Sequence, residues 1–127
     1  MKSERKVIVG VMGGGTVSKE EYEMAFELGK RIAKKGWMLL NGGRNAGVMR
    51  ASAEGAKSAK GTTIGILPGN TSNDANPFID IPIATGISDA RNFVNVLTSD
   101  IIVACAGSAG TISEIALALK NGKTVVL

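Results

Sequence analysis

Two charged side chains stand where helices are expected to begin, and both could act on a bound anion. The first is Arg91, whose charge opposes the positive dipole end of a helix start. This unfavourable position indicates that the guanidinium serves a ligand, because arginine offers paired N–H donors to anions. The alternative is an exposed arginine paired with Asp89 or Asp100. We favour the ligand, because anion-binding loops are expected nearby.

The second side chain is Glu114, which follows Thr111 by three residues. A carboxylate there could act as a general acid or base on a bound substrate. The spacing TxxE is also that of a capping box, which would account for Thr111 and Glu114 without any catalysis. Spacing alone leaves both interpretations open.

The elements that must position these side chains centre on residues 101–120. Six unbroken apolar residues, 101–106, predict a strand buried on both faces, as in parallel sheets. Residues 106–110 have small side chains, so their backbone can turn sharply and approach another group closely. Thr111 is expected to open a helix whose positive dipole end faces this turn. The combination predicts an anion site, and phosphate is its usual occupant.

Two more glycine-rich loops are expected at the same edge of the sheet. Residues 13–16 follow an apolar strand at 6–12, and residues 41–47 follow another at 37–40. The carboxyl ends of parallel strands share one edge, where ligands bind. None of the loops has the GxGxxG fingerprint with a following acidic residue, or the lysine of a P-loop. Chemistry based on NAD or on nucleoside triphosphates is therefore disfavoured.

Around these loops, apolar strands alternate with segments of helical period. Strands are expected at residues 6–12, 37–40, 62–67, 81–84, 101–106 and 124–127. Helices are expected at about 18–36, with Ser18 and Glu21 as a capping box, at 47–60, from 88 or 89 onward, and at 111–120. This alternation predicts an α/β fold in which a doubly wound, mainly parallel, Rossmann-like sheet forms three layers with its helices. We expect one domain over residues 1–127.

Composition excludes several functional classes. The chain of 127 residues has no histidine, which removes nucleophile–histidine pairs and the common histidine metal sites, so we expect no metal site. The single cysteine, Cys105, is expected in the core. Net charge is +4, and the basic cluster at 30–35 suits the end of a helix. With five aromatic residues and no long apolar segment near the N-terminus, we expect a cytoplasmic protein that binds neither nucleic acid nor membrane.

Two motifs carry a resemblance to a known superfamily. NGGRNAGVM at residues 41–49 and AGSAGTISE at 106–114 resemble the signatures GGGxxGLM and PGGxGTxxE of the superfamily once labelled lysine-decarboxylase-like. It includes cytokinin-activating nucleoside-monophosphate phosphoribohydrolases and molybdenum-cofactor carrier proteins. The resemblance implies a Rossmann-like fold and a homodimer or larger homo-oligomer.

The resemblance also implies roles for individual residues. Arg91 and Glu114 match the catalytic pair that assists cleavage of the bond between base and ribose. The ligand-binding residues, which would hold a phosphate or shape the opposite side of the pocket, are Gly13, Gly14, Gly42, Gly43, Gly47, Gly107, Ser108, Gly110 and Thr111.

Three departures from the enzyme signatures favour the carrier-type branch. Ala106 and Ser108 replace the proline and the second glycine, and Asn92 replaces the lysine after the arginine. We therefore expect binding of a phosphorylated nucleotide-like or pterin ligand at the strand C-terminal edge, with the molybdenum cofactor as a carried ligand. The alternative is a phosphoribohydrolase that releases free base from nucleoside 5′-monophosphates. The chain ends at a strand, whereas relatives continue into another helix; a truncated chain or a compact variant would both explain this.

Overall fold

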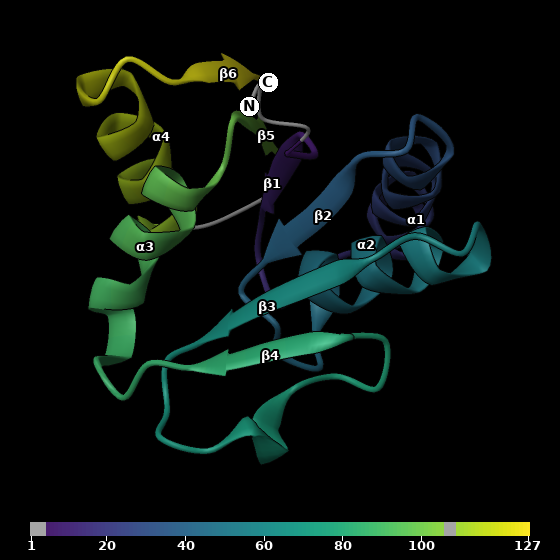
Figure 1. Cartoon of the computed structure of the whole chain (residues 1–127), viewed down its shortest axis with the longest axis horizontal. Helices are drawn as coiled ribbons and strands as arrows, with labels where there is room; N and C mark the ends of the chain where they lie inside the picture. Colours follow the sequence, from purple (N-terminus) through teal and green to yellow (C-terminus); the bar gives the residue numbers. More distant parts are fainter. Residues whose placement is uncertain (1–4, 106–108) are drawn as a thin grey trace.

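The fold is built on one parallel sheet with the strand order β4-β3-β2-β1-β5-β6 (Figure 1). The computed structural model describes residues 5–105 and 109–127. All five neighbouring strand pairs are parallel. The elements are β1 (Ile8–Met12), α1 (Lys19–Lys34), β2 (Met38–Asn41), α2 (Gly47–Ser58), β3 (Thr63–Leu67), η1 (Ser72–Asp74), β4 (Ile81–Ala84), η2 (Ser88–Ala90), α3 (Arg91–Thr98), β5 (Ile101–Ala104), α4 (Ala109–Lys120) and β6 (Thr124–Val126). The predicted Rossmann-like α/β fold is confirmed.

Helices cover both faces of the sheet, and each face has its own apolar core. Helices α1 and α2 lie on one face, and α3 and α4 lie on the other (Figure 1). Side chains alternate along a strand, so Leu39 belongs to the core under α1 and α2, whereas Leu40 belongs to the core under α3 and α4. Within the described residues, no helix is long and apolar enough to cross a membrane.

Helix α1 has the predicted start and end. The backbone N–H of Glu21 donates to Ser18 Oγ over 3.1 Å, and the backbone N–H of Ser18 donates to Glu21 Oε1 over 2.8 Å, which confirms the capping box. Arg31 and Lys34 stand in the last turn, where cations complement the dipole. The basic cluster therefore marks the end of a helix.

Helices α1 and α2 pack with their backbones in contact. A Cβ atom on Gly29 of α1 would overlap the carbonyl oxygen of Ser52 on α2. Conversely, a Cβ atom on Gly55 of α2 would overlap the carbonyl oxygen of Phe26. Two glycines thus allow a helix crossing that no larger residue would permit.

Strand β5 differs from the prediction. It ends at Ala104, and only Ile102 is fully buried, while Ile101 and Val103 are half-buried. The expectation of a strand buried on both faces is wrong at the end of β5, where Val103 and Ala104 line a cavity of about 380 Å³ together with residues of α1. Cys105 lines this cavity and is half-buried; burial raises the pKa of its thiol.

Candidate functional site

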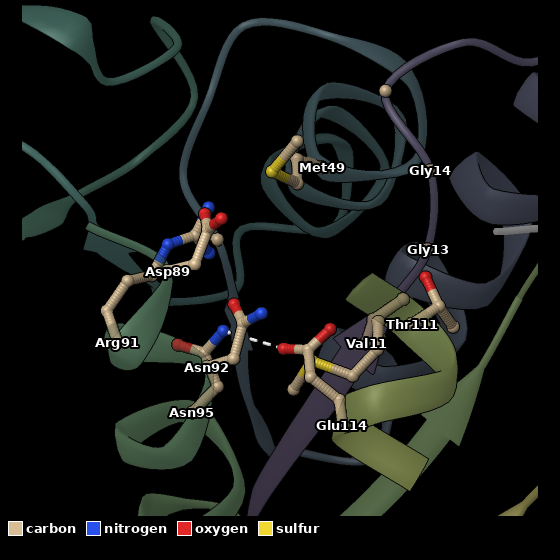
Figure 2. A pocket seen from close by; sticks show the side chains of 13 residues that line it. Val11, Gly13, Gly14, Met49, Asp89, Arg91, Asn92, Asn95, Thr111 and Glu114 are labelled. Carbon is tan, nitrogen blue, oxygen red and sulfur yellow. Dashed lines mark hydrogen bonds between the residues drawn. The ribbon is translucent and has the colours of Figure 1, made fainter. Parts of the chain in front are cut away.

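A cavity lies at the carboxyl edge of the sheet, lined by residues of four elements and of the loops beside them. Its volume is about 140 Å³, below the range of about 300–1,000 Å³ that drug-sized ligands occupy. The side chains converge on it from β1, α2, α3 and α4 (Figure 2). The lining consists of Val11, Met12, Gly13, Gly14, Gly15, Gly42, Met49, Asp89, Arg91, Asn92, Asn95, Thr111 and Glu114. We call this the first cavity.

The loop after β1 can approach the cavity because it lacks side chains. A Cβ atom on Gly13 would lie 2.6 Å from Val48 Cγ2, too close for any L-residue without a shift. The carbonyl oxygen of Gly14 accepts a 3.0 Å hydrogen bond from the backbone N–H of Val48. The start of α2 therefore fixes the glycine loop in place.

The loop after β2 is shaped by the buried side chain of Asn41. Its Nδ2 donates to the carbonyl of Met49 over 2.9 Å and to Ser52 Oγ over 3.0 Å, while its Oδ1 accepts from the backbone N–H of Gly43 over 2.7 Å. Gly42 then lies against the arginine of the site, because a Cβ atom there would overlap Nη1 of Arg91. This loop thus forms one wall of the first cavity.

Arg91 is buried within the lining, with 8% of its surface exposed. Its Nε has no hydrogen-bond partner among the described residues. Burial lowers the pKa of the guanidinium, whereas the nearby charges of Glu114 and Asp89 act in the opposite direction. The alternative of an exposed arginine paired with Asp89 or Asp100 is wrong, because the side chain of Arg91 is buried. Asp100 lies 3.3 Å from Arg5 Nη2 instead. Arg91 is therefore a buried cation with donor capacity left over.

Glu114 is also buried, with 7% of its surface exposed. Its Oε2 accepts a 2.9 Å hydrogen bond from Asn95 Nδ2 (Figure 2). Burial raises the pKa of this carboxyl, and the hydrogen bond from Asn95 and the charge of Arg91 oppose the rise. The capping box between Thr111 and Glu114 is wrong, because α4 begins at Ala109 and Thr111 already lies inside the helix.

The structure brings six of the predicted site residues to the first cavity and leaves others apart. Those in its lining are Gly13, Gly14, Gly42, Arg91, Thr111 and Glu114. Gly43 instead lies against Gly65 of β3 with a φ of +78°, and Gly47 starts α2 against the carbonyl oxygen of Gly14. Gly107 and Ser108 lie outside the described residues, and Gly110 lies in the first turn of α4.

Seven residues of the lining were not among the predicted site residues: Val11, Met12, Gly15, Met49, Asp89, Asn92 and Asn95. For Asn95 a signal existed, since it follows Arg91 by four residues and so shares its face of the helix. Its Oδ1 is buried without a hydrogen-bond partner in the described part of the chain. The first cavity thus contains both an unused donor and an unused acceptor.

A second, larger cavity adjoins the first. Its volume is about 590 Å³, and its lining consists of Arg44, Asn45, Ala46, Pro68, Gly69, Asp74, Ser88 and Asp89. Asp89 lines both cavities. The charge of Arg44 also acts on Arg91, which places the arginine of the second cavity near the arginine of the first.

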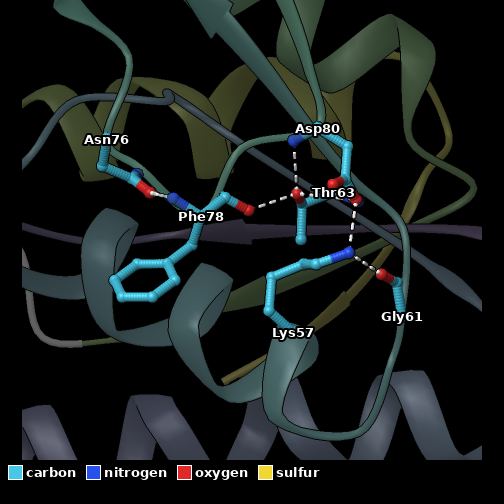
Figure 3. Close-up of polar contacts among 6 residues, drawn as sticks. All are labelled: Lys57, Gly61, Thr63, Asn76, Phe78 and Asp80. Atoms are coloured by element: carbon cyan, nitrogen blue, oxygen red, sulfur yellow. Dashed lines mark hydrogen bonds and ion pairs between the residues drawn. The ribbon is translucent and has the colours of Figure 1, made fainter.

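The segment between β3 and β4 is held firmly beside the second cavity. Thr63 Oγ1 donates to the carbonyl of Phe78 over 2.6 Å and accepts from the backbone N–H of Asp80 over 2.8 Å (Figure 3). Lys57 Nζ lies 3.0 Å from Asp80 Oδ2. Nearer the cavity, Asn76 Nδ2 donates to the carbonyl of Arg44 over 3.1 Å. The predicted surface loop is therefore anchored at several points.

Among the described residues, no group of three or more acidic, cysteine or histidine side chains could hold a metal ion. What the site does offer is a buried cation, a buried carboxylate and a glycine-rich wall, in a cavity sized for a small group.

Two solved structures share this fold at about half sequence identity. The molybdenum cofactor binding protein from the phototrophic bacterium Rippkaea orientalis is 51% identical, with a TM-score of 0.94 over 97% of this chain and 76% of that chain. The molybdenum cofactor carrier protein of Chlamydomonas reinhardtii is 50% identical, with a TM-score of 0.89 over 95% of this chain and 75% of that chain.

One relative with a similar sequence is named as an enzyme. The cytokinin riboside 5′-monophosphate phosphoribohydrolase of Mycobacterium tuberculosis is 31% identical over 105 residues, which are 81% of this chain and 56% of that protein. The predicted resemblance to this superfamily is thus confirmed, because the chain is similar both to molybdenum cofactor carrier proteins and to a cytokinin riboside phosphoribohydrolase. The model of the SLOG cluster4 family matches residues 6–127, and the chain belongs to this family.

Proposed function

We propose that this protein binds the molybdenum cofactor as cargo, with the phosphate of the cofactor in the first cavity. The observation that carries the proposal is the buried guanidinium of Arg91, whose Nε lacks a partner among the described residues. A buried cation is costly unless an opposite charge compensates it. A bound phosphate would supply the compensating negative charge and accept a hydrogen bond from the Nε–H group of Arg91.

The surroundings of Arg91 suit an anion. The loop at Gly13 to Gly15 presents backbone without side chains, and such backbone can approach a phosphate closely. Thr111 lies near the start of α4, where the dipole favours negative charge. Glu114 and Asp89 are the carboxylates in the lining of the first cavity that would oppose an anion. Burial raises the pKa of Glu114, which weakens its share of that opposition.

The carrier assignment is favoured over the enzyme by the sequence around these residues. Identity to the two proteins named for the cofactor is 50–51%, against 31% for the phosphoribohydrolase. Asn92, which lines the first cavity, stands where the enzyme signature has a lysine. The site would therefore keep the phosphate contact without the full catalytic surroundings.

The phosphoribohydrolase remains the second candidate because of one observation. Arg91 and Glu114 line the same cavity, and a buried carboxyl with a raised pKa can serve as a general acid. Cleavage of a base–ribose bond passes through an oxocarbenium-like state that a carboxylate stabilises. This function requires release of free base from nucleoside 5′-monophosphates.

A loading experiment tests the proposal. Cofactor freshly released from a molybdenum enzyme is mixed anaerobically with the protein, which is desalted and assayed for molybdenum by mass spectrometry. Wild type should retain the metal, and Arg91→Met should retain at least tenfold less. Arg31→Met, an exposed arginine on α1, removes the same charge and should behave as wild type. Equal retention by Arg91→Met would refute the proposal.

A second assay decides between carrier and enzyme. Wild type and Glu114→Gln are incubated with a panel of nucleoside 5′-monophosphates, and free base is measured. The carrier predicts no release by either protein. Release by wild type that Glu114→Gln abolishes would establish the hydrolase instead.

A further inference from the structure

We propose that the second cavity holds the planar heterocycle of the ligand, and that Asp74 selects rings with a 2-amino-4-oxopyrimidine edge, as in pterins and guanine. This inference rests on the proposed function, because it assumes that the phosphate of the same ligand lies in the first cavity. It adds what the phosphate contact cannot provide, which is discrimination between heterocycles.

The two cavities are adjacent, because Asp89 lines both. The inference is that one ligand occupies both. The first cavity, at about 140 Å³, suits a phosphate group, and its unpartnered Arg91 Nε points independently to an anionic ligand. The second, at about 590 Å³, lies within the range typical of ring-containing ligands.

The walls of the second cavity suit a flat ring. Ala46, Pro68 and Gly69 contribute little side-chain bulk, which leaves a surface against which a planar heterocycle can lie. Arg44 stands on the same lining, and the guanidinium plane of arginine stacks on aromatic rings. The cavity thus combines a wall of small side chains with a cation suited to stacking.

Asp74 has its carboxylate available for a ligand. Within the described residues it forms no ion pair, and its carboxylate accepts no hydrogen bond. Gly69 lies directly beside it, because a Cβ atom there would be 3.3 Å from Asp74 Oδ2. A carboxylate offers two acceptor oxygens side by side, which match two adjacent N–H donors.

The match depends on the type of heterocycle. The 2-amino-4-oxopyrimidine edge presents an amino N–H and a ring N–H next to each other, so both carboxylate oxygens can accept. The edge of adenine presents one amino N–H beside a ring nitrogen lone pair, which a carboxylate oxygen repels. A site built around Asp74 should therefore prefer pterins and guanine over adenine.

The position of Asp74 is fixed by its own segment. Asp74 ends η1, whose first residue follows Thr71, and the Thr71 Oγ1 accepts a 3.2 Å hydrogen bond from the backbone N–H of Asn73. Two residues later, the backbone N–H of Asn76 donates to the carbonyl of Gly43 over 2.8 Å. The carboxylate is thus presented by an anchored backbone, which is what selectivity requires.

The test uses titration calorimetry with neopterin monophosphate, guanosine 5′-monophosphate, adenosine 5′-monophosphate and inorganic phosphate. Wild type should bind the first two at least about tenfold more tightly than adenosine 5′-monophosphate. Asp74→Asn should reduce that preference to less than about threefold, and the readout is the ratio of the nucleotide affinities, because the loss of a negative charge acts on all the phosphate ligands alike. Glu23→Gln, an exposed position on α1, makes the same change of charge and should keep the preference.

The outcomes separate this inference from the function on which it rests. Equal affinity of wild type for guanosine and adenosine monophosphates, or a preference that survives in Asp74→Asn, overturns the role of Asp74. A preference for the adenosine nucleotide also overturns it and supports the hydrolase. The phosphate titration is independent: if Arg91→Met binds inorganic phosphate as well as wild type does, the proposed function itself fails.

Discussion

Asn95 Nδ2 donates a 2.9 Å hydrogen bond to Glu114 Oε2, and this contact joins α3 to α4 within the lining of the first cavity. Both side chains are buried. A buried carboxylate needs such a donor, because its charge is otherwise uncompensated. Asn95 is therefore a positioning residue for Glu114.

Replacing Asn95 with leucine should destabilise the protein. The change keeps the size of the side chain but leaves Glu114 without its donor, at an expected cost of about 1–3 kcal/mol. Urea unfolding at neutral pH measures the loss. In the Glu114→Gln background the same replacement should cost less, because no buried charge is left unpaired. An equal cost in both backgrounds would show that packing alone is responsible.

The free energy of unfolding should depend on pH through Glu114. Burial raises the pKa of this carboxyl above its ordinary value of 4.5, so the folded state binds its proton more tightly than the unfolded state does. The stabilisation that the folded state gains from protonated Glu114 is fully present below pH 4.5, and it is lost as pH rises through the pKa of this carboxyl in the folded state. Glu114→Gln should remove this part of the slope, whereas Glu27→Gln at an exposed position should keep it. Identical slopes in all three proteins would contradict the prediction.

Replacing Arg91 with methionine should weaken ligand binding, and in the Glu114→Gln background it should do so without weakening the fold. Replacing both opposite charges of a buried pair is often neutral or stabilising, whereas removing only one is costly, and the charge of Arg91 acts on Glu114. We therefore expect the ligand-free double variant to be between unchanged and about 2 kcal/mol more stable than wild type. Added phosphate should raise the melting temperature of wild type but not that of Arg91→Met. A large loss of stability of the double variant without ligand would instead make Arg91 a structural residue.

Gly13→Ala should be destabilising, and Gly15→Ala should not. A Cβ atom at Gly13 would lie 2.6 Å from Val48, whereas one at Gly15 would meet its nearest atom, Ala46 Cβ, at 3.7 Å. Overpacking of this kind costs about 1–3 kcal/mol. Thermal unfolding of the two variants gives the comparison, and Val48→Ala should rescue Gly13→Ala only in part, because the Cβ atom of residue 48 would still lie 2.7 Å from the new Cβ atom. Similar losses in both glycine variants would argue against the Val48 contact as the cause.

The parts of the fold that depend on local patterns could be predicted from the sequence. The capping box of Ser18 and Glu21 was confirmed, and strand β4 has the predicted bounds, Ile81–Ala84. Apolar alternation and turn residues specify such elements without any knowledge of distant contacts. The loops at residues 13–16 and 41–47 were placed at the correct edge for the same reason, because each follows a parallel strand.

The parts that depend on contacts between elements could not be predicted. The start of α4 at Ala109 was missed because small residues are compatible with either a turn or a helix. The partner of Glu114 was missed because Asn95 lies 19 residues earlier, and only the packing of α3 against α4 brings the two together. The second cavity likewise requires residues from four separate segments.

The contact of Gly29 and Gly55 with the opposing backbones has a consequence for the wall of the first cavity. Because α1 and α2 touch backbone to backbone, neither can slide past the other, and the glycine loop that hydrogen-bonds to Val48 is tied to this stiff pair. The wall of the first cavity that this loop forms is therefore fixed by backbone packing two helices away from the ligand, so a larger residue at Gly29 or Gly55 would shift the wall without touching the site.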